Sequence, residues 1–242
     1  MIPSWITAIG SVAMAIGPPL VYADQGVSIV RKKDSTGFSR DICAILLIAN
    51  ITRCFFWLGA GFEFALLLQS IFMIVAQLAL LFVCLHYRPR VTPGSYAPSP
   101  RPFSFWQWSS YTQYIECLAS IILCSAITFL IFGRFEFYIS LSGFFALGLE
   151  STLPLPQLIS NYKHKSLYGF RASTMIGWVG GDAFKTAYFF LQGSPLQFKA
   201  CAIFQLSVDA MIVAQRLYYG NTPPAPVLEG EGVEEVLVLS EA

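Results

Sequence analysis

Six of the polar or ionisable residues inside long apolar runs of the sequence are candidates for chemistry. They are Asn50, Arg53, Glu150, Asp182, Lys185 and Asp209. An ionisable group near the middle of a bilayer costs several kcal/mol, so such groups usually line a cavity or pair with one another. Arg53 follows Asn50 by three positions, which places both on one helix face. Lys185 follows Asp182 by the same interval, so the sequence predicts two polar helix faces of similar design.

These residue types suit a substrate that carries both an anionic group and an amine. Arg53 offers the anionic group a bidentate fork and Lys185 offers it a point charge. The carboxylates of Glu150, Asp182 and Asp209 are candidates to accompany the amine. Two other interpretations stay open. A carboxylate can carry a proton and couple export of a small zwitterion to a lumenal pH gradient, or Asp182 and Lys185 neutralise each other and only lock helix packing.

The composition places these residues in a membrane. Charged residues make up 12% of the 242 positions and hydrophobic residues 55%, with a net charge of +1 and a mean hydropathy of +0.61. An ordinary soluble domain carries about 25% charged residues. These figures exclude a cytosolic enzyme, a disordered chain and a nucleic-acid binder, and they predict an integral membrane protein.

Seven apolar runs are each long enough for a helix that crosses the hydrocarbon, which needs roughly 20 residues. We expect an all-α bundle whose spans are Trp5–Ala23, Asp41–Ala60, Phe64–Tyr87, Tyr111–Phe132, Phe137–Leu158, Ser173–Gln192 and Leu196–Tyr219. Eleven of the fifteen Lys and Arg residues fall on one side of this arrangement and two on the other. The positive-inside rule makes the first side cytosolic, so the N-terminus is predicted to be lumenal and the C-terminus cytosolic.

The two halves of the chain repeat each other. A shift of 132 positions superposes Asp24-Gln25 on Pro156-Gln157, Asn50 on Asp182, Arg53 on Lys185 and Phe56 on Tyr188. We therefore predict two parallel three-helix repeats, 5–87 and 137–219, related by an axis along the membrane normal. A linking fourth helix, 111–132, follows a cytosolic proline-rich linker, 88–110, and an acidic tail, 220–242, is expected to be disordered. The aromatic residues before the linking helix are expected to form a membrane-interface belt.

This pattern resembles the PQ-loop family, and within it the branch of PQ-loop repeat-containing protein one, which includes a fungal member. The stretches that carry the resemblance are Gly37-Phe38-Ser39, Asn50-Ile51-Thr52-Arg53, Phe56-Trp57, Pro154-Leu155-Pro156-Gln157, Asn161-Tyr162-Lys163, Gly181–Phe189 and Pro195–Phe198. The resemblance implies an ATP-independent phospholipid scramblase of Golgi and endosomal membranes that opposes aminophospholipid flippases. Related proteins suggest two alternatives, a proton-coupled exporter of a small amino acid or related solute and a trafficking receptor.

The Pro-Gln element predicts a hinge. Pro156 removes a backbone donor within an apolar run, and Pro154 lies two positions before it. We expect Pro154, Pro156 and Gln157 to form the hinge, with Gln157 capping the exposed backbone or meeting substrate. Gln25 is the counterpart in the first repeat, but Asp24 replaces the proline there. Either Pro18 and Pro19 substitute for that proline, or the first half of the chain is static.

Nothing in the sequence indicates covalent chemistry or a cofactor. His86 and His164 each lack a second metal-type neighbour, so no metal site is predicted. The sequence contains no nucleophile elbow, phosphate loop or HExxH motif. We expect a lipid or solute translocator whose partners are phospholipids and the bilayer, and we assign neither a nucleic acid nor a protein partner.

Overall fold

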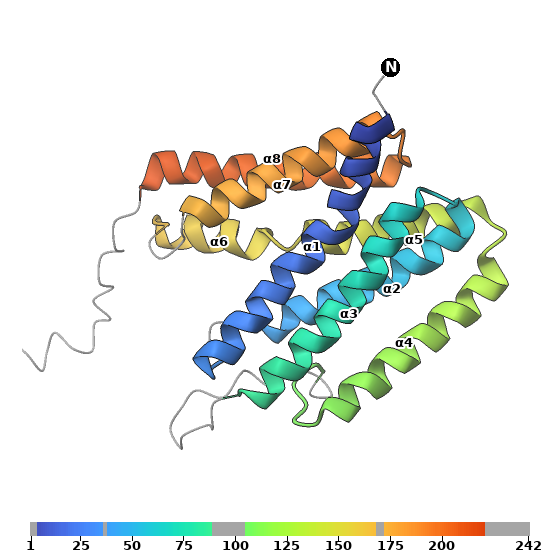
Figure 1. The fold of residues 1–242 in the computed structure, drawn as a ribbon, viewed down its shortest axis with the longest axis horizontal. Coiled ribbons are helices and arrows are strands. Elements are labelled where there is room, and N and C mark those ends of the chain that lie inside the picture. The colour runs from blue at the N-terminus through green and yellow to red at the C-terminus, as the bar shows by residue number, and fades with distance from the viewer. Residues whose placement is uncertain (1–3, 36–37, 89–104, 168–171, 221–242) are drawn as a thin grey trace, which may run out of the picture. The chain divides into compact units, whose positions relative to one another are not determined.

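The computed structural model describes residues 4–35, 38–88, 105–167 and 172–220 (Figure 1). Over these residues the chain is all helical, which confirms the predicted fold class. The eight helices that the described residues form are α1 (Ser4–Lys32), α2 (Arg40–Ala60), α3 (Phe64–His86), α4 (Tyr111–Phe132), α5 (Glu136–Ser151), α6 (Leu155–His164), α7 (Ala172–Leu191) and α8 (Leu196–Tyr219). Most of the predicted linker and nearly all of the predicted tail lie outside the described residues.

Four of these helices are long and apolar enough to cross a membrane by length and composition, namely α2, α3, α4 and α8. The protein is therefore a multi-pass membrane protein. The other three predicted spans correspond to α1, to α7 and to the pair α5 and α6. Polar residues or a helix break interrupt the apolar character of these three segments.

The first helix does not end near Ala23, where the first predicted span ends. Helix α1 continues for 29 residues, through Pro18 and Pro19 and then through Asp24 and Gln25. Its buried residues include Met14 and Ile29, and it packs along α3. A membrane helix can contain prolines when it packs against a neighbouring helix. The packing supports the helix where backbone hydrogen bonds are missing.

The fifth predicted span is two helices rather than one. Helix α5 ends at Ser151, and α6 begins at Leu155 with Pro154 as its N-cap and Pro156 in its first turn. Proline has no N–H to continue the ladder, and its ring clashes with the carbonyl four residues earlier. Pro154 also disfavours helical geometry at Leu153. Two prolines this close together therefore end α5 and start α6 at the position of the Pro-Gln element.

The chain divides into two compact units. The first unit is Met1–Leu153 with Gly181–Leu206, and the second is Pro154–Gly180 with Ser207–Ala242. The division coincides with the break between α5 and α6, and it cuts α7 between two consecutive glycines, Gly180 and Gly181.

Helix α2 is central in the first unit, where it contacts α3, α4 and α5. Ser39 caps its N-terminus by accepting a hydrogen bond from the Asp41 backbone, and Gly61 ends it with φ of 57°. Helix α4 fully buries Tyr114 and Leu118 on this core, half-buries Ile121 and exposes other apolar residues such as Leu130. This exposure fits the predicted linking helix if it faces lipid.

The prediction that the aromatic residues before α4 form a membrane-interface belt is wrong for Trp106, which is only 1% exposed. Its indole donates to the Arg40 carbonyl at 2.9 Å. The Arg40 guanidinium in turn donates to the Tyr114 hydroxyl at 2.8 Å. These bonds fix the start of α2 against the start of α4, so Trp106 is a core residue of the first unit.

Candidate functional site

A charged cluster lies in the first unit, where α2, α5 and α7 contribute one residue each. Arg53 from α2 forms an ion pair with Oε2 of Glu150 from α5. Lys185 from α7 places its Nζ 3.6 Å from Oε1 of the same Glu150. Arg53 and Lys185 are the equivalent cations of the two predicted repeats, and one carboxylate contacts both.

Two further polar groups complete the cluster on the side of Lys185. Its Nζ lies 3.4 Å from Oδ1 of Asp182, one turn earlier on α7. It also donates to Oε1 of Gln205, on α8, at 3.1 Å. The four ionisable groups thus comprise two cations and two carboxylates, which balance in charge. Any anionic group that enters must compete with Glu150 or Asp182 for the cations.

The helix break positions Glu150. This residue occupies the last turn of α5, four positions before Pro154. The neighbouring Ser151 hydroxyl contacts the carbonyls of Leu147, at 2.8 Å, and Cys201, at 3.2 Å, which attaches the end of α5 to α8. Discontinuous membrane helices build substrate and ion sites in many transporters, because their ends supply polar groups at the midplane. A charged residue beside such a break is therefore a strong candidate for a functional group.

The cluster is closed in this conformation. Side-chain exposure is 3% for Arg53, 14% for Glu150, 15% for Lys185 and 13% for Asp182. The void beside these side chains has a volume of about 10 Å³. A single water molecule needs at least roughly that space. A phospholipid head group is far larger, so it can enter only after the surrounding helices move.

Two buried polar atoms at the void have no hydrogen-bond partner among the described residues. They are Nε of Arg53 and Oε1 of Gln69, a residue of α3. Leaving a buried polar group unsatisfied costs about 1–3 kcal/mol. The closed cluster therefore retains one unused donor and one unused acceptor, both available to a polar ligand.

An aromatic cluster packs beside the charges. The Phe198 ring centroid lies 6.0 Å from Cζ of Arg53, 5.0 Å from the Phe189 ring and 4.8 Å from the Phe62 ring. Phe56, one turn after Arg53 on α2, completes the group, 5.1 Å from Phe62. These rings exclude water around Arg53, which strengthens its attraction to Glu150.

Sequence reasoning missed a second polar network, centred on Glu63. Its Oε1 accepts hydrogen bonds from the Ser11 hydroxyl at 2.7 Å and the Tyr188 hydroxyl at 2.5 Å. The three residues come from α1, the turn before α3, and α7. The sequence held one signal for this network, a carboxylate directly before the apolar run that begins at Phe64. Glu63 lies between the predicted spans that end at Ala60 and begin at Phe64, so it was not among the predicted site residues.

Comparison with known proteins adds family information to this geometry. The family described as PQ loop repeat matches residues 138–198. The match includes the helix break and Glu150, Asp182 and Lys185, so the family signature falls on the second predicted repeat. The first repeat remains a prediction from the sequence.

A curated protein of Saccharomyces cerevisiae (strain ATCC 204508 / S288c), named Scramblase ANY1, is 26% identical to this chain. The alignment covers 90% of the chain and 72% of the yeast protein. Together with the PQ-loop match, this similarity confirms the resemblance drawn from the sequence. The similarity extends over both predicted repeats, beyond the segment that the family match covers.

Asn50 and Asp209 are the remaining predicted site residues. Asn50 is fully buried one turn before Arg53, and its Nδ2 donates to the Leu46 carbonyl at 2.8 Å. Its Oδ1 has no hydrogen-bond partner among the described residues. Asp209 is 1% exposed and belongs to the second unit, so it is described apart from the cluster.

The predicted hinge residues differ between the two halves. Gln25 lies within the continuous helix α1, and no break surrounds it. Pro154 and Pro156 flank the start of α6, where the helix is interrupted. Nε2 of Gln157 donates to Oδ1 of Asn161 at 2.7 Å. This bond runs along α6 between two side chains, and the role of Gln157 as a backbone cap or a substrate contact stays a prediction.

Proposed function

We propose that this protein is an ATP-independent phospholipid scramblase of Golgi and endosomal membranes, where it opposes aminophospholipid flippases. Its head-group path passes the charged cluster, and we propose Asn50 and Asp209 as further head-group contacts. One observation carries the proposal: two cations from equivalent positions of the two repeats meet one carboxylate, Glu150, beside a helix break. The similarity to a protein named Scramblase ANY1 supports the lipid substrate.

The geometry suggests how the path opens. Movement of the α5 end at Pro154 withdraws Glu150 from Arg53 and Lys185. The two cations are then available to a phosphate, with Arg53 binding through its planar fork and Lys185 as a point charge. Glu150 and Asp182 are released at the same time and can accompany a head-group amine. Lipid tails stay in the bilayer throughout, and no covalent bond changes, so the protein acts as a translocator rather than an enzyme.

A buried ion pair can also serve packing alone, and a paired substitution separates the two roles. Apolar residues of similar volume usually replace such a pair at no cost in stability. We therefore expect Arg53→Met with Glu150→Met to fold normally, with Lys185 still paired to Asp182. Scrambling should fall at least about tenfold, corresponding to roughly 1.4 kcal/mol in the barrier.

The measurement uses the purified chain in vesicles that hold a fluorescent phospholipid in both leaflets. A membrane-impermeant quencher is added outside, and functional protein takes quenching beyond one half. Leu130→Met, at an exposed position of α4, is the matched control for introduced methionine. Quenching that stops at one half with wild-type protein refutes the scramblase. Wild-type rates in the double methionine variant refute the role of the cluster.

The central position of Glu150 favours a second candidate, a proton-coupled exporter of a small amino acid or related solute from an acidic organelle. A proton on Glu150 would weaken its attraction to both cations, which couples protonation to opening. The test loads the same vesicles with labelled amino acid and imposes a pH gradient. Gradient-dependent transport without lipid scrambling would favour the exporter over the scramblase.

A further inference from the structure

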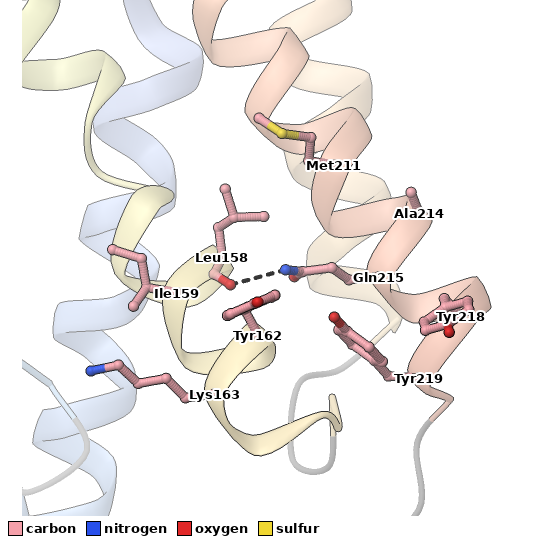
Figure 2. Close-up of a pocket in the computed structure, with 9 residues that line it drawn as sticks. All are labelled: Leu158, Ile159, Tyr162, Lys163, Met211, Ala214, Gln215, Tyr218 and Tyr219. Atoms are coloured by element: carbon pink, nitrogen blue, oxygen red, sulfur yellow. Dashed lines mark hydrogen bonds between the residues drawn. The ribbon is translucent and has the colours of Figure 1, made fainter.

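An open groove of about 640 Å³ lies in the second unit, between α6 and the last turns of α8 (Figure 2). Sites for small ligands commonly have volumes of 300–1,000 Å³. Leu158 and Met211 line one part of the groove, and Tyr162 and Tyr219 line another. Figure 2 shows Tyr162 and Tyr219 facing each other across it, from α6 and α8.

The groove changes from apolar to polar along α8. Met211 and Tyr219 are eight positions apart, or roughly 12 Å at the helical rise of 1.5 Å per residue. Both lie on a helix that is long and apolar enough to cross a membrane, and Tyr219 is its last residue. The tyrosine end of the groove thus belongs at the head-group level and the Met211 end in the hydrocarbon. An amphiphile with a polar end and an apolar chain fits this polarity.

The polar end carries positive charge. Nζ of Lys165 lies 3.6 Å from the Tyr162 ring centroid and 3.3 Å from the Tyr219 hydroxyl, to which it donates. Lys163 lines the groove with its stem, and Figure 2 shows its amine extending outward from α6. Across 154–167, 172–180 and 207–220, the charged residues are Lys163, Lys165, Arg216 and one carboxylate, Asp209, which is buried. The accessible charge of these segments is therefore cationic.

A buried acceptor lies on the groove wall. Nε2 of Gln215 donates to the Leu158 carbonyl at 3.0 Å, as Figure 2 shows. Oε1 of Gln215 is buried and has no hydrogen-bond partner among the described residues. It can accept from a hydroxyl or amine of a bound head group.

We propose that this groove binds a phospholipid with a net negative head group from the leaflet at which α8 ends. The acyl chain lies along Leu158 and Met211, and the head group lies beside Lys163 and Lys165. Charge complementarity selects the anionic lipid, and the apolar half of the groove selects a lipid over a soluble anion. The role of the groove rests on the proposed scramblase function. In a scramblase, the groove would collect the lipid substrate at the predicted cytosolic face.

The test places a photoreactive amino acid at Met211 in the full-length chain. The chain is reconstituted in phosphatidylcholine vesicles that contain a minor fraction of phosphatidylserine, and adducts are identified by mass spectrometry. The matched control carries the probe at Ile176, an exposed residue of α7 in the same unit. The Met211 probe should capture phosphatidylserine at several times its share of the bilayer, while the Ile176 probe reports the bulk composition.

Two variants make the result specific. The double variant Lys163→Gln with Lys165→Gln should remove the phosphatidylserine enrichment. Each lysine near an anionic surface contributes about fivefold in affinity. Ala214→Trp fills the groove and should reduce all lipid adducts at Met211 while both lysines remain. If the double glutamine variant fails to fold, judged by its helical circular dichroism, Ala214→Trp still decides the outcome.

Three results would overturn the inference. The lipid adducts at Met211 could match the bulk lipid composition, or they could be insensitive to Ala214→Trp. The third result is a Met211 probe that reacts with the chain's own glutamate-containing segment 221–242. Scrambling is measured in the same vesicles. Scrambling without enrichment rejects the groove and leaves the proposed function standing. Enrichment without scrambling rejects the proposed function and leaves an anionic-lipid site.

Discussion

The two predicted repeats hold their equivalent cations in different ways. In the second repeat, Lys185 has a carboxylate on its own helix, Asp182, at 3.4 Å. In the first repeat the corresponding position is the neutral Asn50, so Arg53 takes its partner from another helix, Glu150 of α5. The pairing of Lys185 is therefore local, whereas that of Arg53 depends on where α5 ends. Movement of α5 changes the electrostatics of the first repeat more than those of the second.

The helix at the start of each predicted repeat also differs between the two halves. Helix α1 of the first repeat is continuous through two prolines, while its counterpart is split into α5 and α6. The helix break thus lies in the second predicted repeat, and one of the two cations beside it belongs to the first. Glu150 connects the two, since it lies at the break and contacts both cations. Four experiments test this comparison.

Loss of the Glu150 charge should have the largest effect. Glu150→Gln leaves Arg53 buried without a carboxylate, and breaking a buried pair costs about 3–5 kcal/mol. Asp182→Asn should cost much less, because Lys185 keeps Glu150. Thermal unfolding in detergent, followed by circular dichroism, compares the two variants. Equal losses would show that the two cations do not differ in their dependence on α5.

Removing the prolines should close the break. Pro154→Ala with Pro156→Ala makes one helix of α5 and α6 more favourable, at up to about 3 kcal/mol for an interior proline. Scrambling should slow by at least roughly tenfold. Pro18→Ala with Pro19→Ala, in the continuous α1, is the matched control and should change the rate less than threefold. If the control slows scrambling as much, flexibility is not confined to the second repeat.

Asn50→Asp should make the first repeat resemble the second. Arg53 then has a carboxylate three positions away on α2, as Lys185 has in α7. Introduced into Glu150→Gln, this change should recover about half of the lost stability, since it restores a partner for the buried cation. Asn50→Leu in the same background is the control and should recover nothing. Equal recovery by leucine would indicate packing rather than charge.

Tyr188→Phe should have the smallest effect. This change gives the second repeat the residue found at its counterpart, Phe56, and removes the hydroxyl that donates to Glu63 at 2.5 Å. A hydrogen bond to a charged group contributes about 1.5–3 kcal/mol, and Ser11 still donates to Glu63, so we expect a loss near the lower value. Chemical unfolding measures it, with Tyr138→Phe as the control at a hydroxyl pair exposed on α4 and α5. If the loss is no larger than that of the control, the hydrogen bond from Tyr188 to Glu63 does not contribute to stability.

The sequence determined the residues of the cluster but not their pairing. Arg53, Glu150, Asp182 and Lys185 stand out because charges within apolar runs are costly and few. Which carboxylate meets which cation depends on helix rotation and on the contacts between helices, and linear spacing does not specify these. Glu63 was missed for a related reason, because a carboxylate in a connecting turn becomes buried only when α1 and α7 pack over it.

By itself the sequence established a multi-pass helical membrane protein and the position of the Pro-Gln element, because hydropathy and proline act locally on the chain. It could not decide that two prolines in α1 leave a helix continuous while two others end α5. That difference comes from the packing of α1 along α3, which supports the helix where backbone hydrogen bonds are missing. Only the tertiary structure placed Glu150 between two cations and closed the space around them, because these are distances between helices far apart in the chain.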